Sequence, residues 1–599
     1  MKENDKNAFI GFILMATVLI VFNIFFLPEI NTDTTKQEEE IKNTSEYIES
    51  DFTIYNNNTK KDDALVTQEL ISNYGLFANS AVGKEEFEIL ENEKLKLFFS
   101  NKGGRITSVI LKEYETYDSL PLSLFNIDSS NFNLQFSTGN NINTKDLYFE
   151  SSKDQNTISM KLKIDNNHYV EYFYKLENDY IVTFHINFVG MQSILTQNYM
   201  TMEWQMKTPQ TEKSKENQDM YTGIYYQYST DKEVDNLSLT SSDEEKIKYN
   251  LNWIAFKQQF FSSIFIAKNG FEKDITLKSN MDEGSNFIKD LYAKFELEYS
   301  QKKSEKFEFE FYFGPNNFKK LKKYNASFEE IIPLGWGIFG WVNKYVIINI
   351  FDFLSKYISN YGLIILLLTI IIKLALAPFT YKAFLSQAKM KVLKPEIDKI
   401  NSKFKGKDPM KIQQETMAVY RKAGVNPMGG CLPMLFQFPI LIAMFRFFPA
   451  SIELRQQSFL WADDLSAYDS IMSLPFHIPF YGDHVSLFTL LMTISTLLYT
   501  KMNASMATGQ MAQMKWMMYL MPIMFLGFFN NYAAALSYYY FLANMFTFSQ
   551  QYFMKRLVNE KDILTQIEKN KKNPKKKSKF QKKLEELQKK QQEQMRKRK

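Results

Sequence analysis

Apolar residues crowd into two parts of this chain, 8–27 and 331–553, and the remainder is polar. The first part carries no charge and is long enough to cross a hydrocarbon core of about 30 Å. A cleavable signal peptide is the alternative, but the apolar region is long and no small-x-small cleavage site follows it. We therefore expect an uncleaved transmembrane anchor within residues 1–30.

Further membrane spans are expected within the second apolar part. The candidates are Ser359–Phe379, Gly429–Ala450, Val485–Thr500, Trp516–Phe529 and Ala533–Phe553. Residues 331–357 are ambiguous, because their aromatic residues also suit a span. Since tryptophan and tyrosine stand there beside Asn343 and Lys344, we interpret this stretch as an interfacial amphipathic helix.

Charge segregation supports a count of six spans. Residues 28–333 hold 34 Lys and Arg against 49 Asp and Glu, a net charge of −15. Residues 380–425 hold 11 Lys and Arg against 4 Asp and Glu, and residues 554–599 hold 18 Lys and Arg against 6 Asp and Glu. The positive-inside rule then places both termini and residues 380–425 in the cytoplasm and residues 31–330 outside. A crossing at 331–357 would turn the basic segment outward.

The outside region predicts a β-rich domain. Apolar positions alternate at Ile158, Met160, Leu162 and Ile164, a turn follows at 165–167, and the alternation resumes at Val170, Tyr172 and Tyr174. This is the pattern of a β-hairpin, and it recurs at 295–299 and 307–311. We expect a large antiparallel β-sandwich over 85–330, joined to the anchor by a flexible tether over 31–84.

Lys373 is a cation inside an apolar span. Nine residues separate it from Lys382, which places it roughly 13 Å inside the cytoplasmic end. An ammonium at such a depth costs about 2.5–3.5 kcal/mol on insertion scales. Thr369 lies one turn away on the same face, and because no carboxylate lies in any expected span, the candidate partners are neutral: Gln437, Ser495 and Asn544.

Two interpretations of Lys373 remain open. A lysine with neutral neighbours and no counter-ion predicts a wet cavity open to the cytoplasm. The alternative is that its long side chain snorkels toward the headgroups. Snorkelling is the interpretation we adopt for Arg446, which lies near the outer end of its span.

The basic segment 380–425 predicts a helical hairpin. Its markers are apolar residues at helical spacing (Leu393, Ile397, Ile400, Phe404), a first end at Gly406, a second start at Asp408-Pro409 and a second end at Gly424. Pro395 is expected to kink or break the first arm. One interpretation is that the hairpin binds ribosomes, targeting factors or anionic lipid. The other is that its charge only fixes the topology of the chain, and both can hold together. The basic residues concerned are Lys389, Lys394, Lys399, Lys403, Lys411 and Arg421.

Some expected spans are short. Trp516–Phe529 has 14 residues and would cover about 21 Å, which thins the surrounding bilayer. Eight methionines lie between 502 and 524. Flexible thioethers suit surfaces that accept many apolar partners, although they also serve as gap-fillers.

Several motifs together resemble the YidC-type membrane protein insertases of the YidC/Oxa/Alb family. They are Lys373–Thr380 (KLALAPFT), Val425–Pro433 (VNPMGGCLP), Gln437–Ile440 (QFPI), Ser451–Arg455 (SIELR) and Tyr539–Asn544 (YYFLAN). The resemblance covers about 335–556 with all landmarks in order. One departure is Tyr532-Ala533-Ala534-Ala535, where many relatives have a Pro-Ser-Gly turn.

The resemblance implies a multi-span α-helical membrane protein of six helices, five of them forming an insertase core over 358–556, with a basic cytoplasmic tail over 557–599. It implies a groove open to the cytoplasm and to lipid, containing Thr369, Gln437 and Tyr540. The family's groove cation is usually arginine, and Lys373 stands in that position without the planar donor fork. The first span together with a large outside β-sandwich resembles the long form of the family, which is found in bacteria with two membranes. The sandwich would then lie in the periplasm.

The function implied is therefore an inner-membrane insertase and chaperone, not an enzyme, that works alone or with the Sec translocon. Its partners would be nascent membrane proteins, Sec components, ribosomes or targeting factors, and lipid, with no DNA, cofactor or metal. A transporter or channel is the first rival, but no internal repeat is visible. A scaffold for other translocation components is the second.

Overall fold

The computed structural model describes residues 67–272, 274–281, 286–404, 409–425, 432–504 and 515–572. Several predicted features lie outside these residues: the anchor, most of the tether, Gly406, Asp408, Cys431, three of the eight methionines between 502 and 524, and the tail beyond 572. The described chain divides into two compact units. A β unit holds residues up to Pro333 together with Ala450–Gln456, and a helical unit holds Leu334–Pro449 and the chain from Gln457 onward.

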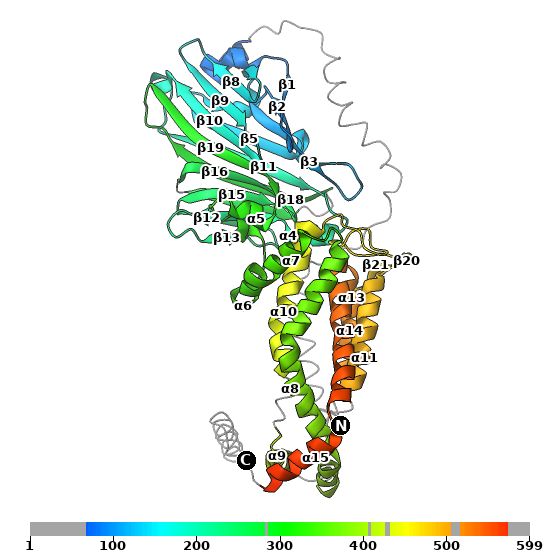
Figure 1. Ribbon diagram of the computed structural model, residues 1–599. Coiled ribbons are helices and arrows are strands. Elements are labelled where there is room, and N and C mark those ends of the chain that lie inside the picture. Colours follow the sequence, from blue (N-terminus) through cyan, green and yellow to red (C-terminus); the bar gives the residue numbers. More distant parts are fainter. Residues whose placement is uncertain are drawn as a thin grey trace. The chain divides into compact units, whose positions relative to one another are not determined.

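The β unit is an antiparallel sandwich, as predicted (Figure 1). Its nine-stranded sheet runs β13 (Val234–Asn236), β12 (Gly223–Tyr228), β15 (Leu251–Lys257), β16 (Phe261–Phe271), β19 (Ser304–Pro315), β10 (Ile181–Val189), β9 (Tyr169–Leu176), β8 (Thr157–Lys163) and β7 (Glu150–Asp154). The six-stranded sheet runs β14 (Asp243–Ile247), β17 (Ile275–Met281), β18 (Phe287–Glu298), β11 (Tyr199–Pro209), β5 (Ser130–Ser137) and β6 (Asn141–Asn143). A four-stranded sheet runs β1 (Phe87–Glu91), β2 (Leu95–Ser100), β3 (Arg105–Glu115) and β4 (Pro121–Phe125).

Alternation of side chains produces the core of this sandwich. On β10 every second residue is buried, as the period of a strand requires. The expected hairpin is the β8–β9 pair, with Leu162 opposite Val170. Trp204 of one large sheet stacks on Phe256 of the other with ring centroids 3.8 Å apart, so the two inner faces interlock.

Short helices complete the β unit. They are α3 (Gln68–Tyr74), η2 (Gly75–Ala81), η3 (Ile127–Ser129), η4 (Thr144–Asp146), η5 (Met191–Ser193), α4 (Lys215–Tyr221), α5 (Phe318–Lys322), η6 (Phe328–Ile331) and η9 (Ile452–Leu454). The flexible tether was expected to reach residue 84. For its last part the prediction is wrong, because residues 68–81 are helical. Phe77 is fully buried there, because it packs its ring edge against Phe136 of β5.

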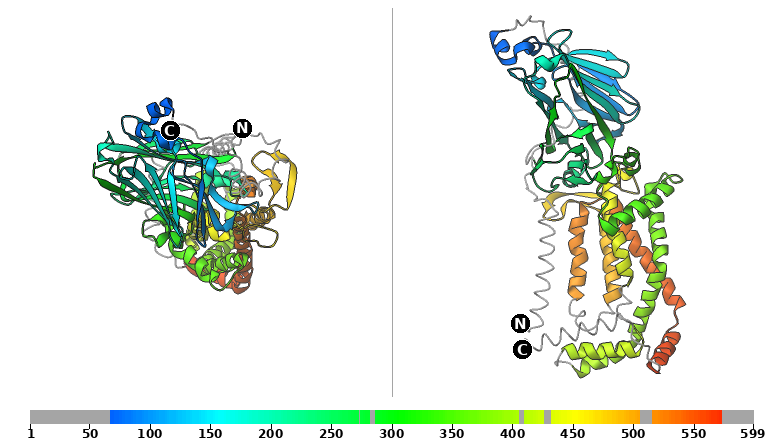
Figure 2. Two further views of the ribbon diagram at one scale, coloured as in Figure 1. Left: turned by 90° about the horizontal axis from the view of Figure 1, so that it is seen from above. Right: turned by 90° about the vertical axis from the view of Figure 1, so that its left-hand side faces the viewer.

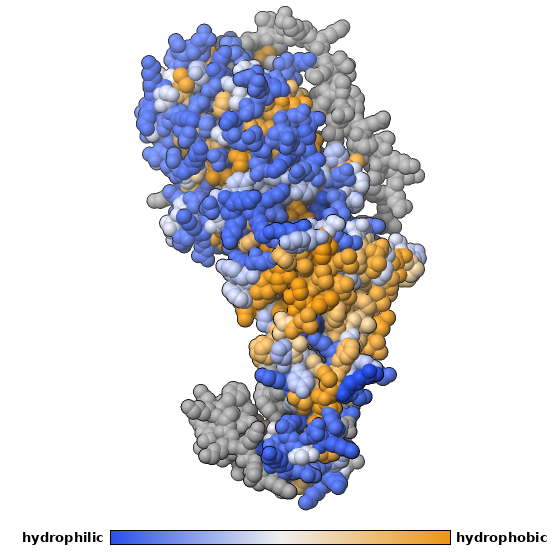
Figure 3. All heavy atoms as spheres, viewed as in Figure 1, coloured by the Kyte–Doolittle hydropathy of each residue, from blue (hydrophilic) through white to orange (hydrophobic). Residues whose placement is uncertain are grey.

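The helical unit contains long helices and a small β-hairpin. Its elements are α6 (Gly337–Val342), a π-helical turn η7 (Asn343–Ile347), α7 (Ile348–Ser355), α8 (Tyr361–Lys403), α9 (Pro409–Lys422), α10 (Leu432–Ala450), β20 (Met472–Ile478), β21 (Gly482–Val485), α11 (Leu487–Ala504), α13 (Lys515–Asn530), α14 (Ala534–Leu557) and α15 (Glu560–Lys572). Figures 1 and 2 show α8, α10, α11, α13 and α14 side by side. Apolar side chains form a belt over them on the face seen in Figure 3.

One described helix, α8, is both long and apolar enough to cross a membrane, and three shorter apolar helices accompany it at Leu435–Ala450, Leu487–Met502 and Trp516–Asn530. The count of six spans stays a prediction. Asn360 caps α8 by accepting from the Leu363 N–H at 3.0 Å. Pro395 was expected to kink or break the first hairpin arm, and of these two the break does not occur, since α8 continues to Lys403. Pro395 is exposed, so water can satisfy the carbonyl that its missing N–H would have bonded.

Candidate functional site

Lys373 lies where three helices of the helical unit meet. Its Nζ donates to Thr547 Oγ1 of α14 at 2.9 Å and to Gln437 Oε1 of α10 at a long 3.5 Å. Only 6% of the residue is exposed. An ammonium carries three donors, so these two neutral acceptors leave hydrogen-bonding capacity unused. The described chain holds no ion pair to Lys373.

Helix α14 supplies the partners because its polar residues share one face. Asn544, Thr547 and Gln550 follow one another at intervals of three residues. The Thr547 hydroxyl donates to the Ala543 carbonyl at 2.7 Å, which turns its lone pairs toward Lys373. Gln550 Nε2 donates to the Lys373 carbonyl at 3.1 Å and so ties α14 to α8.

The structure separates the residues proposed as partners of Lys373. Gln437 is the one that contacts it. Asn544 instead donates to Ser495 Oγ and Thr496 Oγ1, both at 3.0 Å, and forms a second polar cluster between α14 and α11. Ser495 therefore satisfies Asn544, and neither is bonded to Lys373 within the described residues.

The other two predicted groove residues lie nearby without bonding to Lys373 in the described chain. Thr369 is fully buried and donates to the Ile365 carbonyl of its own helix at 2.7 Å. Tyr540 is half-buried on α14. Thr547 and Gln550 were missed, although a polar stripe along the last expected span was the signal that pointed to them.

The opposite end of the helical unit holds a polar network that is internally satisfied. Asp469 accepts from the backbone N–H groups of Leu487 and Phe488 at 2.8 and 3.0 Å, and thereby caps the start of α11. It also accepts from Trp461 Nε1 at 2.8 Å and Ser486 Oγ at 2.5 Å.

Asn530 extends this network to the end of α13. Its side chain accepts from the Ser486 N–H and donates to the carbonyls of Tyr481 and His484. The polar groups of Asp469 and Asn530 are thus hydrogen-bonded within the network, whereas the ammonium of Lys373 keeps unused donor capacity.

The basic hairpin carries a third helix. The apolar residues of α8 and α9 enclose Ile563 and Ile567 of α15 in one buried cluster. Asn570 donates to the Ala423 carbonyl at 3.1 Å, and Lys571 pairs with Glu396 at 2.6 Å. Residues 557–599 were predicted to be a basic tail, and the structure adds that 560–572 form a helix, whose isoleucines, four residues apart, give it an apolar face to bury.

The hairpin's predicted basic residues differ in exposure. Lys399, Lys403 and Arg421 are exposed, Lys389 and Lys394 are half-buried, and the side chain of Lys411 lies outside the described residues. Helix α9 begins at Pro409, as expected, and Gly424 adopts the left-handed conformation with φ +67° after its end.

Arg446 lies over the ring of Trp336, with its guanidinium carbon 5.7 Å from the ring centroid. A cation–π contact therefore ties α10 to the start of α6. The predicted interfacial helix is divided into α6, η7 and α7, and it exposes Trp336, Trp341 and Tyr345. Asn343 in the π turn is fully buried and donates to the carbonyls of Leu334 and Ala443.

Within the β unit, the segment that follows α10 is held by a buried ion pair. Arg455 Nε lies 2.9 Å from Glu212 Oε2, and its Nη2 donates to the Glu115 carbonyl at 2.6 Å. The guanidinium also lies 5.1 Å from the ring centroid of Phe261. The motif ending in Arg455 thus has a structural role in this unit.

Two lysines are buried in the same unit beside the end of α4. Lys289 Nζ donates to the carbonyls of Asp219, Thr222 and Leu239 at 2.7–3.0 Å and lies 3.2 Å from the Asp219 carboxylate. Burial, together with the nearby charge of Lys289, lowers the pKa of Lys257 to about 7. Lys257 Nζ donates to the Tyr221 carbonyl at 2.6 Å.

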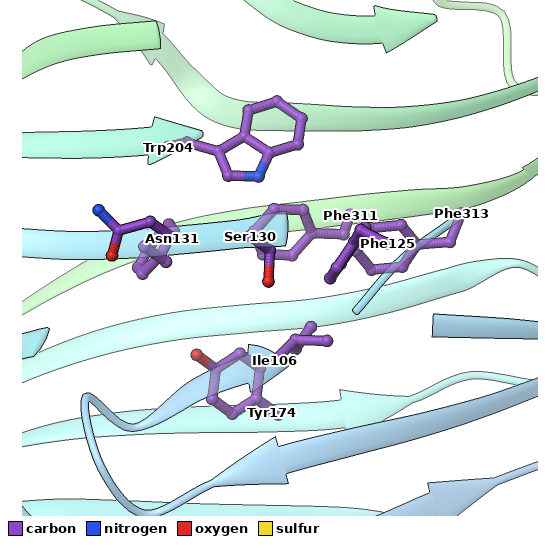
Figure 4. A pocket seen from close by; sticks show the side chains of 9 residues that line it. Ile106, Phe125, Ser130, Asn131, Tyr174, Trp204, Phe311 and Phe313 are labelled. Carbon is purple, nitrogen blue, oxygen red and sulfur yellow. The ribbon is translucent and has the colours of Figure 1, made fainter. Parts of the chain in front are cut away.

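One small cavity is described within the β unit. It has a volume of about 20 Å³, enough for about one water molecule. Figure 4 shows Trp204, Tyr174 and Phe311 among the side chains around it. No group of His, Cys, Asp and Glu in the described part of the chain is arranged to hold a metal ion.

Each unit matches a known protein family model. Residues 353–562 match the family model of the 60Kd inner membrane protein, and residues 89–348 match that of the YidC periplasmic domain. The membrane protein insertase YidC of Parabacteroides distasonis is 41% identical over 613 aligned positions, which cover 96% of each chain.

Two solved structures add to this comparison. A crystal structure of an active YidC insertase covers 79% of this chain and 93% of its own, with 18% identity and a TM-score of 0.32. A galactose mutarotase-like protein from Lactobacillus casei covers 38% of this chain and 100% of its own, with 8% identity and a TM-score of 0.27.

Proposed function

Because the chain belongs to the YidC family of membrane protein insertases, we propose that Lys373 is the cation of a hydrated groove through which new membrane proteins enter the inner membrane. The observation that carries the proposal is the bonding of Lys373: a buried ammonium with one good neutral acceptor and one long one. An ammonium so placed in lipid requires water or a visiting anion. Acidic residues of a client supply that anion.

The groove opens toward the cytoplasm. Its outer end is filled by the network of Asp469 and Asn530, whose polar atoms are already bonded, so no water path is needed there. Thr547, Gln437 and Gln550 line the cation, and Asn544 with Ser495 fixes α14 against α11. Six spans, with both termini in the cytoplasm and the β unit in the periplasm, complete the arrangement.

Insertion then needs no nucleotide. The polar outer end of a client leaves water partway in the groove, and Lys373 attracts its carboxylates. Helix α13 has 16 residues and covers about 24 Å, so the bilayer beside it is thinned and easier for the polar end to cross. Met521 and Met524 are exposed on this helix and offer an adaptable apolar surface. The free energy comes from burial of the client's apolar segment in lipid.

The basic hairpin with α15 forms a cytoplasmic platform for ribosomes, targeting factors or anionic lipid. Sec components are a further set of partners, and chaperoning of folding follows from holding a client at the lipid boundary. These roles rest on the family and on the exposed charges of Lys399, Lys403 and Arg421.

Reconstitution tests the proposal against its rivals. The purified full chain in liposomes, mixed with a small single-span client, should protect the client's outer end from added protease. Empty liposomes are the control. A scaffold without insertase activity would give no protection above that control, and a transporter or channel would pass small solutes without protecting the client.

A further inference from the structure

The hairpin β20–β21, between α10 and α11 in the chain, presents large apolar side chains to its surroundings. Met472, Phe476 and Phe480 are 54%, 61% and 77% exposed. Residues 470–481 include no lysine, arginine, aspartate or glutamate. A first strand and turn without Lys, Arg, Asp or Glu and with exposed aromatic side chains suit an apolar surface better than open water.

The hairpin tip is packed closely on the end of α13. A Cβ placed on Gly527 would lie 2.4 Å from the Phe480 carbonyl oxygen, so the two backbones approach as closely as glycine alone allows. Asn530 fixes the next residue by donating to the Tyr481 carbonyl at 2.9 Å. The hairpin therefore has a defined position against this helix, next to its end in Figure 1.

Phe480 lies in the tight turn of the hairpin, which the Tyr481 N–H closes by donating to the Ile478 carbonyl at 3.0 Å. Its φ of +65° lies in the left-handed region, where a bulky residue is strained by about 1 kcal/mol or more. The side chain is nevertheless among the most exposed large apolar ones in the described chain. The turn thus fixes the backbone of Phe480 and leaves its ring exposed.

We propose that β20–β21 is an anchor in the outer lipid leaflet, which inserts Phe476 and Phe480 into the interface of the bilayer beside α13. Helix α13, which the hairpin contacts at Gly527, also exposes apolar side chains, among them Ile523 and Phe525. Since α13 covers about 24 Å of a core of about 30 Å, the hairpin supplies apolar surface where the helix ends.

Its depth is limited by its backbone. The two strands pair only with each other and their register is interrupted between Ser473 and Ile478, so several N–H and C=O groups lack a strand partner. Such groups are tolerated at the headgroup level, where water reaches them, and not in the hydrocarbon centre. Pro475 and Pro479 remove two of the donors. We thus place the ring side chains at the boundary between headgroups and acyl chains.

This inference rests on the proposed arrangement of spans, and the test separates the two. Cys431 is the only cysteine, so a Cys431→Ser background accepts single nitroxide labels. Labels at Phe476→Cys and Phe480→Cys report the surroundings of the hairpin, and a label at Ile523→Cys reports the surroundings of α13. Asp483→Cys is the matched control, because its side chain is 72% exposed on the same hairpin. The full chain is reconstituted in phosphatidylethanolamine and phosphatidylglycerol vesicles, and collision rates with oxygen and with a water-soluble nickel complex are measured.

We expect the oxygen-to-nickel collision ratio at 476 and 480 to exceed that at 483 at least threefold, and to approach the ratio at 523. A lipid-like ratio at 523 with water-like ratios at 476 and 480 would overturn the anchor alone and assign the ring surface to a protein partner. A water-like ratio at 523 would overturn the span of α13 and the anchor together.

Discussion

The two units of this protein each bury lysines, and they satisfy them in opposite ways. In the β unit, the Lys289 ammonium donates to three backbone carbonyls and lies beside a carboxylate. In the helical unit, Lys373 has one hydroxyl at 2.9 Å and one amide oxygen at 3.5 Å. Fully satisfied buried charges hold a fold together, whereas a partly satisfied charge keeps capacity for a ligand. The contrast supports the proposal that Lys289 is a structural cation and Lys373 a cation that acts on clients.

Removal of the structural cation should have the largest effect. Lys289→Met leaves the Asp219 carboxylate and three carbonyls buried without their donor, which costs about 3–5 kcal/mol. The urea concentration at which half of the β unit is unfolded should fall accordingly. It is measured by limited proteolysis of the full chain in detergent. Lys268→Met is the control, because that side chain is 44% exposed. An unchanged midpoint for Lys289→Met would show that the buried contacts contribute nothing.

The second buried lysine predicts a pH dependence. Because burial lowers the pKa of Lys257 to about 7 in the folded state, the unfolded chain binds the additional proton between pH 7 and about 10.5. Stability of the β unit should therefore rise with pH, by about 2 kcal/mol between pH 7 and 9. The same urea measurement checks this, and Lys257→Met should remove the rise. A rise that persists in the variant would assign it to other groups.

Removal of the cation that acts on clients should leave the fold intact and reduce function. Lys373→Met forfeits only two contacts and relieves the burial of a charge, so thermal stability should change by less than about 1 kcal/mol. Insertion of a client with an acidic outer end should fall about tenfold in proteoliposomes, equivalent to about 1.4 kcal/mol. Lys373→Arg keeps the charge and should retain most activity. A large loss of stability in Lys373→Met would make Lys373 structural, like Lys289.

The smallest effect is expected at the hydroxyl partner. Thr547→Val keeps the shape and removes the acceptor 2.9 Å from Lys373, so insertion should change about twofold. Thr380→Val is the matched control, since Thr380 also donates to its own helix but lies away from the cation in the described contacts. Equal effects in both variants would exclude a specific role for Thr547.

Local patterns in the sequence predicted much of this. The alternation at 158–174 predicted the β8–β9 hairpin, and Pro409 marked the start of α9, because strand period and helix caps depend on neighbouring residues. Lys373 was found since a charge in an apolar run is conspicuous. Its neighbours were harder to find: Asn544 and Thr547 are one turn apart on α14, and the packing of the helices decides which of them contacts it.

Other features depend on contacts distant in the chain. Ile563 and Ile567 lie in a stretch rich in charge, and their packing on the hairpin requires a partner about 170 residues earlier. Lys257 and Lys289 are charged strand residues that the sequence alone would leave in solvent, but both are buried and donate to carbonyls of α4. Tertiary packing decides these positions.

The central claim is that Lys373 acts as an uncompensated positive charge on the carboxylates of a client. The most direct measurement is protease-protected insertion in proteoliposomes of two matched clients, one with an acidic outer end and one with those residues changed to lysine. The protein with Lys373 should favour the acidic client, and Lys373→Glu should reverse the preference, with a total change of at least tenfold. An unchanged preference in Lys373→Glu would contradict the claim.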